Sequence, residues 1–179
     1  MSIGIFYLSE TIGQDEQKNL LPENGFQLFL KRAPNINFWV QKANLPGVEL
    51  GVVESPNPFL AIPVPGDHIK FEDFDIIFRV SENLENYLEI YNWMIGLGKP
   101  NEFKQYADLK NNPLPSESIY SDISLLITNS KRNINIQVDL IDAFPQAISG
   151  LQFNVTEQDV QYLYANARFS YSYPKITIL

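Results

Sequence analysis

Residues 165–173 read Ala165-Asn166-Ala167-Arg168-Phe169-Ser170-Tyr171-Ser172-Tyr173, and this stretch decides the fold. Small or aromatic residues alternate strictly with polar ones, which is typical of an antiparallel strand with one buried and one wet face. A second strand pattern, Ile134–Ile141, precedes it and is expected to stop at Ala143-Phe144-Pro145. No nucleophile, metal cluster or phosphate loop accompanies the two strands in the sequence. The pattern therefore indicates a β domain made for assembly rather than for catalysis.

Further strand patterns lie upstream, at 26–32, 37–43, 67–80 and 119–128. A turn is expected at Pro34-Asn35, between the first two. Within 67–80 the apolar phase shifts between Phe71 and Phe74, for which a bulge or bend at Glu72-Asp73 is the expected cause. After Pro174 the chain ends in an apolar tail, and an exposed edge of this kind invites pairing with another chain.

One helix is predicted over residues 82–97, with Ser81 as its N-cap. Its apolar residues recur at helical spacing and form one stripe, which consists of Leu84, Tyr87, Leu88, Tyr91, Met94 and Ile95. The Gly-x-Gly-Lys at 96–99 is like a fragment of a phosphate loop. Because it follows the helix instead of opening it, its amides would not face a phosphate, and it is interpreted as a C-cap.

The segment 45–65 carries five prolines and two glycines, which a central strand would not tolerate. It is interpreted as an extended, projecting loop or irregular hairpin. Loops this long in compact domains are usually functional, so a contact with a neighbouring subunit is the preferred interpretation and a plain surface loop is the alternative.

Length and composition indicate one domain, at 25–179, behind an N-terminal arm at 1–24. The chain has 179 residues, 45% of them hydrophobic, which suffices for one sizeable core. It has no cysteine, so disulfides and thiolate metal sites are not available. The apolar start of the arm has no basic leader, and neither a signal peptide nor a membrane span is expected. Ile5, Phe6 and Tyr7 either dock on a neighbouring subunit or belong to a frayed terminus.

Three segments together carry a resemblance: Phe38–Gly47 with its turn Lys42-Ala43-Asn44-Leu45-Pro46, Ile62–Phe74 with its Gly-Asp, and the closing aromatic strand Asp159–Tyr173. In order and spacing they resemble the tail tube proteins of T-even-like contractile-tailed bacteriophages. The resemblance implies a mainly β (α+β) fold, an antiparallel β-sandwich or barrel with one main helix, whose sheets join between subunits into a ring-shaped barrel. It implies hexameric rings that stack into the inner tail tube, the conduit for DNA ejection.

The same resemblance implies the partners and the place of the protein. The partners are other copies of the chain, the tail sheath and baseplate proteins, and double-stranded DNA that passes through without specific binding; no cofactor and no membrane are implied. The protein would be assembled in the host cytoplasm and end in the tail of the virion. Expected contact residues are Ile5, Phe6, Tyr7, Val52, Val53, Phe59, Ile176 and Ile178.

Charge fits a conduit. The net charge is −8, with scattered basic residues, so stable binding to nucleic acid is not expected. Glu72, Asp73 and Asp75 are the candidate acidic residues of a lumen along which DNA slides. As alternatives, the acidic excess serves solubility alone, or the three carboxylates hold a cation.

Other function classes remain open alternatives. No catalytic residue is named, because the single histidine, His68, is placed in a Pro-Gly-Asp turn without marked partners. A β-sandwich module that binds carbohydrate or another ligand would use Trp39, Trp93 and the tyrosines as stacking platforms, but most of the aromatic residues occupy apolar phases. Within the tail, a ring at the baseplate that initiates the tube, or a tail terminator, would share the same fold.

Overall fold

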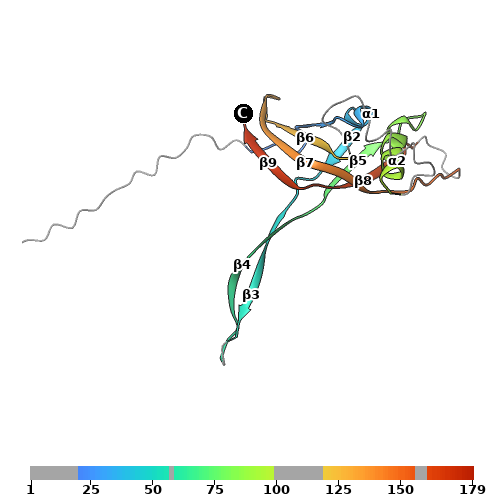
Figure 1. Ribbon diagram of the computed structural model, residues 1–179. Helices are drawn as coiled ribbons and strands as arrows, with labels where there is room; N and C mark the ends of the chain where they lie inside the picture. Colours follow the sequence, from blue (N-terminus) through green and yellow to red (C-terminus); the bar gives the residue numbers. More distant parts are fainter. Residues whose placement is uncertain (1–19, 57–58, 99–118, 156–160) are drawn as a thin grey trace, which may run out of the picture.

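The computed structural model describes residues 20–56, 59–98, 119–155 and 161–179 (Figure 1). Within these ranges the fold is mainly β, with antiparallel strand pairs and two helices. The elements are β1 (Phe26–Leu30), α1 (Pro34–Asn37), β2 (Val40–Ala43), β3 (Val48–Ser55), β4 (Ile62–Phe71), β5 (Phe74–Arg79), α2 (Glu85–Gly98), β6 (Ser121–Thr128), β7 (Ile134–Ile148), β8 (Tyr164–Ser170) and β9 (Tyr173–Ile178). The predicted fold class, a mainly β domain with one main helix, is confirmed.

Seven strands form the body, in the order β1-β6-β7-β8-β5-β2, and β9 pairs with β7. The long β7 joins the two halves of this sheet: its first part pairs with β6 and β9, and its last part pairs with β8. It bends at Asp142, whose φ is 55° and whose amide donates to Asp122 Oδ1 at 3.3 Å. One extra residue on β7 at this point is a bulge, which turns the sheet sharply. Among the described strands, β1 and β2 do not pair with each other, so the sheet is open.

The core lies on the inner face of this bent sheet, under α2. The alternation of β5 and β8 places Phe74, Phe78 and Phe169 there, each fully buried. Helix α2 adds Trp93, whose ring lies 6.3 Å from that of Phe169 and whose Nε1 donates to the carbonyl of Ile119 at 3.2 Å. Trp93 is therefore a packing residue of the core.

Several local predictions were wrong. Residues 143–145 do not end β7, which runs to Ile148. The apolar tail forms β9 along the first part of β7 and leaves its other edge free among the described strands, so the expected exposed edge is present. The turn expected at Pro34 is the first turn of α1, where proline suits the N-terminal position. The phase shift at Glu72-Asp73 is not a bulge, since the chain leaves one sheet there and enters another.

The start of the helix also differs from the prediction. Helix α2 begins at Glu85, so Ser81 is not its N-cap; instead Ser81 opens a turn in which the amide of Leu84 donates to its carbonyl at 2.9 Å. Leu84 has a φ of 59°, outside the helical region. The buried Asn86 holds this turn, because its Oδ1 accepts from the Ser81 amide at 3.1 Å and its Nδ2 donates to the Arg79 carbonyl at 2.7 Å.

Candidate assembly surfaces

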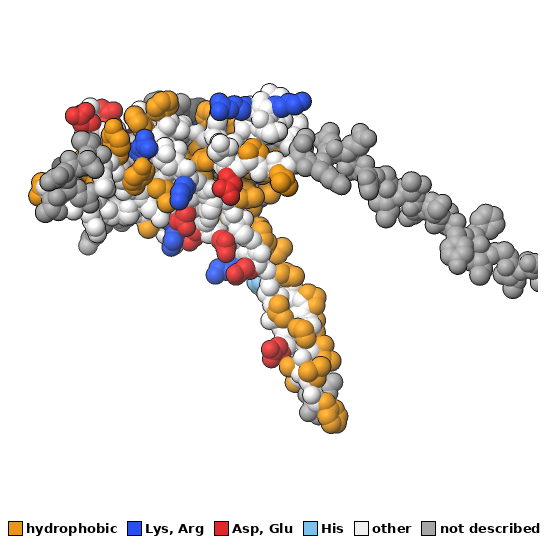
Figure 2. Space-filling view, turned by 180° about the vertical axis from the view of Figure 1, so that it is seen from behind, with side chains coloured by type: hydrophobic (Ala, Val, Ile, Leu, Met, Phe, Trp, Pro, Cys, Tyr) orange, Lys and Arg blue, Asp and Glu red, His pale blue; other side chains and the backbone are white. Residues whose placement is uncertain are grey.

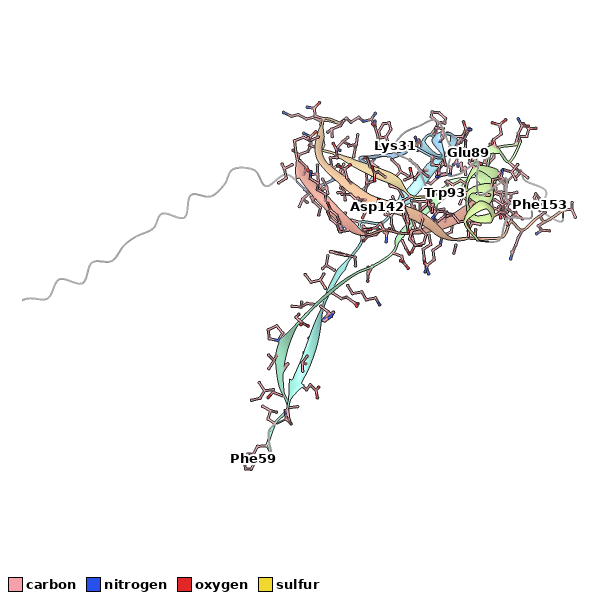
Figure 3. The ribbon with its side chains drawn as sticks, in the orientation of Figure 1. Lys31, Phe59, Glu89, Trp93, Asp142 and Phe153 are labelled. Atoms are coloured by element: carbon pink, nitrogen blue, oxygen red, sulfur yellow. The ribbon has the colours of Figure 1, made fainter. Side chains whose placement is uncertain are left out.

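The hairpin of β3 and β4 is the part of the molecule that stands apart from the core. It projects from the body as an isolated two-stranded ribbon (Figure 1), and Phe59 lies at its far end (Figure 3). Every residue of β3 is exposed. Of the predicted contact residues, Val52 is 65% exposed, Val53 60% and Phe59 95%. Two-stranded hairpins are at best marginally stable alone in water, so this surface calls for a covering partner.

The base of the hairpin is tied to the body through Asn44 and Glu72. The side chain of Asn44 accepts from the Asp75 amide at 2.7 Å and donates to the Asp73 carbonyl at 3.1 Å. The amide of Gly47 donates to Glu72 Oε2 at 3.2 Å, and the amide of Glu72 donates to the Gly47 carbonyl at 3.0 Å. These hydrogen bonds hold β3 and β4 where they leave the body, so the body sets the direction in which the hairpin projects.

The three acidic lumen candidates each have a protein partner. Asp75 pairs with Arg168 at 2.9 Å, and this hydrogen bond together with the carboxylate charge raises the pKa of the guanidinium above its ordinary value. Asp73 Oδ1 accepts from Ser170 Oγ at 3.0 Å, whereas Glu72 is used at the hairpin base. The carboxylates therefore help to hold strands together, and their exposure to a lumen stays a prediction.

The hydroxyl of Tyr171 also bonds to the base of the hairpin. It donates to the carbonyl of Glu72 at 2.8 Å. Burial, followed by the charges of Asp73 and Glu72, raises the pKa of the Tyr171 phenol, so the hydroxyl keeps its proton and remains a donor. The surface around it mixes both signs of charge, since Lys70 and Arg168 line the same shallow cavity as Asp73 and Glu72.

Strand β9 forms one edge of the sheet and carries two more of the predicted contact residues. Ile176 and Ile178 are exposed, the latter by 78%. One edge of β9 is bonded to β7, and its other edge meets no described strand. Unpaired edge strands with exposed apolar side chains are places where another chain can pair.

A third apolar surface, between β1 and β2, was missed at the sequence level. Phe29 and Phe38 are exposed there, Phe38 by 82%, and a groove of about 420 Å³ separates the two edge strands. Phe29 could have been noticed, because it falls in the wet phase of a strand whose inward residues are Leu28 and Leu30. Phe38 had no such signal, since it lies in an aromatic run that is also typical of a core strand.

The aromatic residues proposed as stacking platforms divide into two environments. Trp93 is only 2% exposed and cannot serve as a platform. Trp39 lines a larger groove of about 850 Å³ together with Phe153, Tyr162 and Arg79, whose guanidinium lies 5.4 Å from the Tyr162 ring centre. This groove, formed by described residues, suits the ligand-binding alternative.

Three further predictions concern His68, the N-terminal arm and a membrane span. His68 is not in a turn: it lies inside β4, exposed and beside Asp67. Ile5, Phe6 and Tyr7 lie outside the described residues, as does most of the arm at 1–24. Within the described ranges, neither helix is long and apolar enough to cross a membrane.

No protein-family model matches the sequence, and no curated protein matches it. Solved structures do match. A chain of the baseplate of the anti-feeding prophage, a six-fold symmetrised assembly, is 10% identical with a TM-score of 0.53, over 85% of this chain and 90% of that one. A chain of the tube-terminating cap of the same particle is 12% identical with a TM-score of 0.53, over 100% and 97%. A chain of the sheath–tube complex of the extracellular contractile injection system PVC is 12% identical with a TM-score of 0.49, over 91% and 95%.

At this level of identity the first two matches show the fold alone. The chain thus shares its fold with a chain of the anti-feeding prophage baseplate and with a chain of its tube-terminating cap. The particular relation to T-even-like bacteriophages stays a prediction.

Proposed function

We propose that this protein is a structural subunit that forms rings in the inner tube of a contractile tail or injection system, with no catalytic role. The observation that carries the proposal is the β3–β4 hairpin, a largely apolar ribbon held out from the body and left uncovered by the other described elements (Figure 2). The fold shared with a baseplate chain and a tube-cap chain supports it. Copies of the chain, and beyond them sheath and baseplate proteins, are the proposed partners.

The surfaces suggest how rings would be built. Within a ring of six, the free edges of β9, β1 and β2 would pair with neighbouring copies, so that the open sheets close into one barrel. Between rings, the hairpin would reach the next ring. In a phage tail this barrel would be the conduit for DNA ejection, and an acidic protein would let DNA slide because it does not hold phosphates. Assembly in the host cytoplasm and a final place in the tail follow from this role.

The nearest rival is a ring that occurs once per tail, as a tube initiator at the baseplate or as a terminator. The fold does not separate these roles, since it is found in both a baseplate chain and a cap chain. Stacking does. A bulk tube protein self-stacks into hollow filaments, whereas an initiator or terminator forms single rings.

Negative-stain electron microscopy of the purified protein, over a series of concentrations, tests the proposal. Wild type should form rings, and stacked rings if it is the bulk tube protein. The double variant Val52→Asp/Val53→Asp should remain folded but lose ring stacking, because burying two carboxylates in an apolar contact costs several kcal/mol in total. The control, Asn83→Asp/Gln152→Glu, adds the same charge at exposed sites outside the hairpin. A wild-type protein that stays monomeric at every concentration would overturn the proposal.

A further inference from the structure

The two halves of the hairpin differ in how their faces are built. In the basal half, which we define as residues 48–50 and 69–71, Val48 pairs with Phe71 and Leu50 with Ile69. Cross-strand partners share a face and successive residues alternate, so these four apolar side chains lie on one face. The other face carries the pair Glu49 and Lys70. The basal half is therefore amphipathic, as expected for a ribbon with one covered side.

The distal half, residues 52–56 and 59–65, carries apolar side chains on both faces, and Glu54 is its single charged residue. One face has Val52 opposite Pro65 and Glu54 opposite Pro63; the other has Val53 opposite Val64 and Ser55 opposite Ile62. Val52 and Val53 are neighbours on one strand, so they point to opposite faces, and both are exposed. The sequence from 52 to 65 contains one carboxylate, Glu54, and no Lys or Arg. A ribbon in water on either side would not carry this composition.

A glycine crossing separates the two halves. The register shifts between Leu50 and Val52, where Gly51 faces extra residues of β4. A Cβ added at Gly66 would lie 2.7 Å from the carbonyl oxygen of Gly51, so the two backbones approach more closely than a side chain allows. Bulges increase local twist, and the distal half can therefore turn its faces to different neighbours than the basal half does.

We propose that the distal half of the hairpin is inserted between two other copies of this chain and is covered on both faces. The basal half lies against one surface only and keeps its Glu49–Lys70 face in water. The inference rests on the proposed function, because it takes the covering chains to be subunits of the same assembly.

Three observations select copies of this chain as the occupants. The hairpin points away from its own body (Figure 1), so its own core does not cover it. The distal half has no cation to meet the phosphates of a nucleic acid or a membrane surface. The body itself exposes apolar side chains at its sheet edges, at Phe29, Phe38 and Ile178, which are surfaces of the kind that a mainly apolar ribbon fits.

Thiol reactivity tests the proposal, because the chain has no cysteine and an introduced one is the only thiol. Four single variants report the four surfaces: Leu50→Cys and Lys70→Cys for the basal faces, and Val52→Cys and Val53→Cys for the distal faces. Each is mixed as a minor fraction with wild type before assembly, so the rings and filaments remain essentially wild type. Reaction with a maleimide is then timed in the assembled and in the dilute, unassembled state.

On assembly, the rates of Val52→Cys, Val53→Cys and Leu50→Cys should fall by at least about tenfold, while that of Lys70→Cys stays within about twofold. If either distal cysteine keeps reacting like Lys70→Cys, one distal face is open and the proposal is wrong. Protection of all four would also overturn it, since the basal half would then be covered on both sides. Failure of the proposed function looks different, because microscopy would then show no rings or filaments in the same samples.

Discussion

At the scale of single residues, Asn86 fixes the chain before α2, a role that the sequence analysis gave to Ser81 as N-cap. It is fully buried, and its amide joins the end of β5 to the turn before α2 through the Arg79 carbonyl and the Ser81 amide. In the sequence Asn86 is a polar residue outside the predicted apolar stripe, and only the fold reveals that its side chain bonds to the preceding turn. A buried side chain that pairs two backbone groups holds them in place, because each would otherwise lose its hydrogen bond.

Asn86→Ala should therefore lower the free energy of unfolding by about 1–3 kcal/mol, since it leaves these backbone groups without their partner. Urea unfolding of the purified protein measures this. The matched control is Asn92→Ala, on the exposed side of the same helix, which should change stability by less than about 0.5 kcal/mol. Equal midpoints for the two variants would contradict the role given to Asn86.

A second prediction at this scale concerns Glu89, on the α2 face that meets α1 (Figure 3). Partial burial raises the pKa of Glu89 above its ordinary value of 4.5, against the lowering effect of the Asn35 amide, which donates to Oε1 at 2.7 Å. Because the pKa of Glu89 is higher in the folded state, the protonated side chain stabilises the fold. This contribution is complete below pH 4.5 and is lost as the pH rises through the pKa of the folded state.

The variant Glu89→Gln does not titrate, so its stability relative to wild type should increase as the pH rises from 4.5 and then level off. Urea unfolding at a series of pH values measures the difference. Glu82→Gln, which removes an exposed carboxylate in the preceding turn, controls for the loss of one charge. If wild type instead became more stable relative to Glu89→Gln as the pH rises, the ionised carboxylate would be better accommodated in the fold than in water.

At the scale of elements, the sequence predicted the strands whose two faces differ most. The alternation corresponds to buried and exposed positions in β8 at 165–169, and to buried and partly buried positions in β5 at 74–78, because each strand has one face on the core. The predictions were wrong for the strands that contain proline. Pro63, Pro65, Pro145 and Pro174 were taken as breakers, yet each lies in a strand segment with one free edge, where the missing N–H need not take part in the ladder. Sequence alone does not reveal which strands are edges.

The same limit applies to the candidate surfaces. Val52, Val53 and Phe59 could be selected because a proline-rich segment outside the strand pattern is expected to project, and they are exposed in the structure. Phe29 could also have been selected, from its place in the wet phase of β1, whereas Phe38 could not, because its exposure depends on β1 and β2 being the two ends of the sheet. Strand order is set by contacts between segments that are distant in the sequence, and the periodicity within one segment does not reveal it.

The hairpin itself gives the prediction at this scale. Gly66→Ala should disturb the crossing of the two strands, because the added methyl group meets the backbone of Gly51, which cannot rotate away as a side chain could. Amide hydrogen exchange in the hairpin of the unassembled protein should become faster, while the thermal midpoint of the body changes little. Gly150→Ala is the control, since its Cβ would have no neighbour within 4 Å. Unchanged exchange in the hairpin of Gly66→Ala would show that the crossing is not needed to form it.

At the scale of the whole molecule, charge and apolar surface act in opposite directions on assembly. Each chain has a net charge of −8, so a ring of six would carry six times −8, or −48. Like charges oppose the approach of subunits, and salt shortens the range of this repulsion from about 10 Å at 0.1 M to about 3 Å at 1 M. The proposed contacts are apolar, at the hairpin and the sheet edges, and burial of such surface does not depend on attraction between charges.

Ring formation and stacking should therefore become stronger as salt is raised from about 0.1 M to about 1 M, with a lower protein concentration at which assembly begins. Sedimentation of wild type across this range measures that concentration, and Asn83→Asp/Gln152→Glu, with its two extra negative charges, should show a steeper dependence on salt. Disassembly at high salt would contradict the apolar contacts, because it would mean that ion pairs between subunits hold the assembly together.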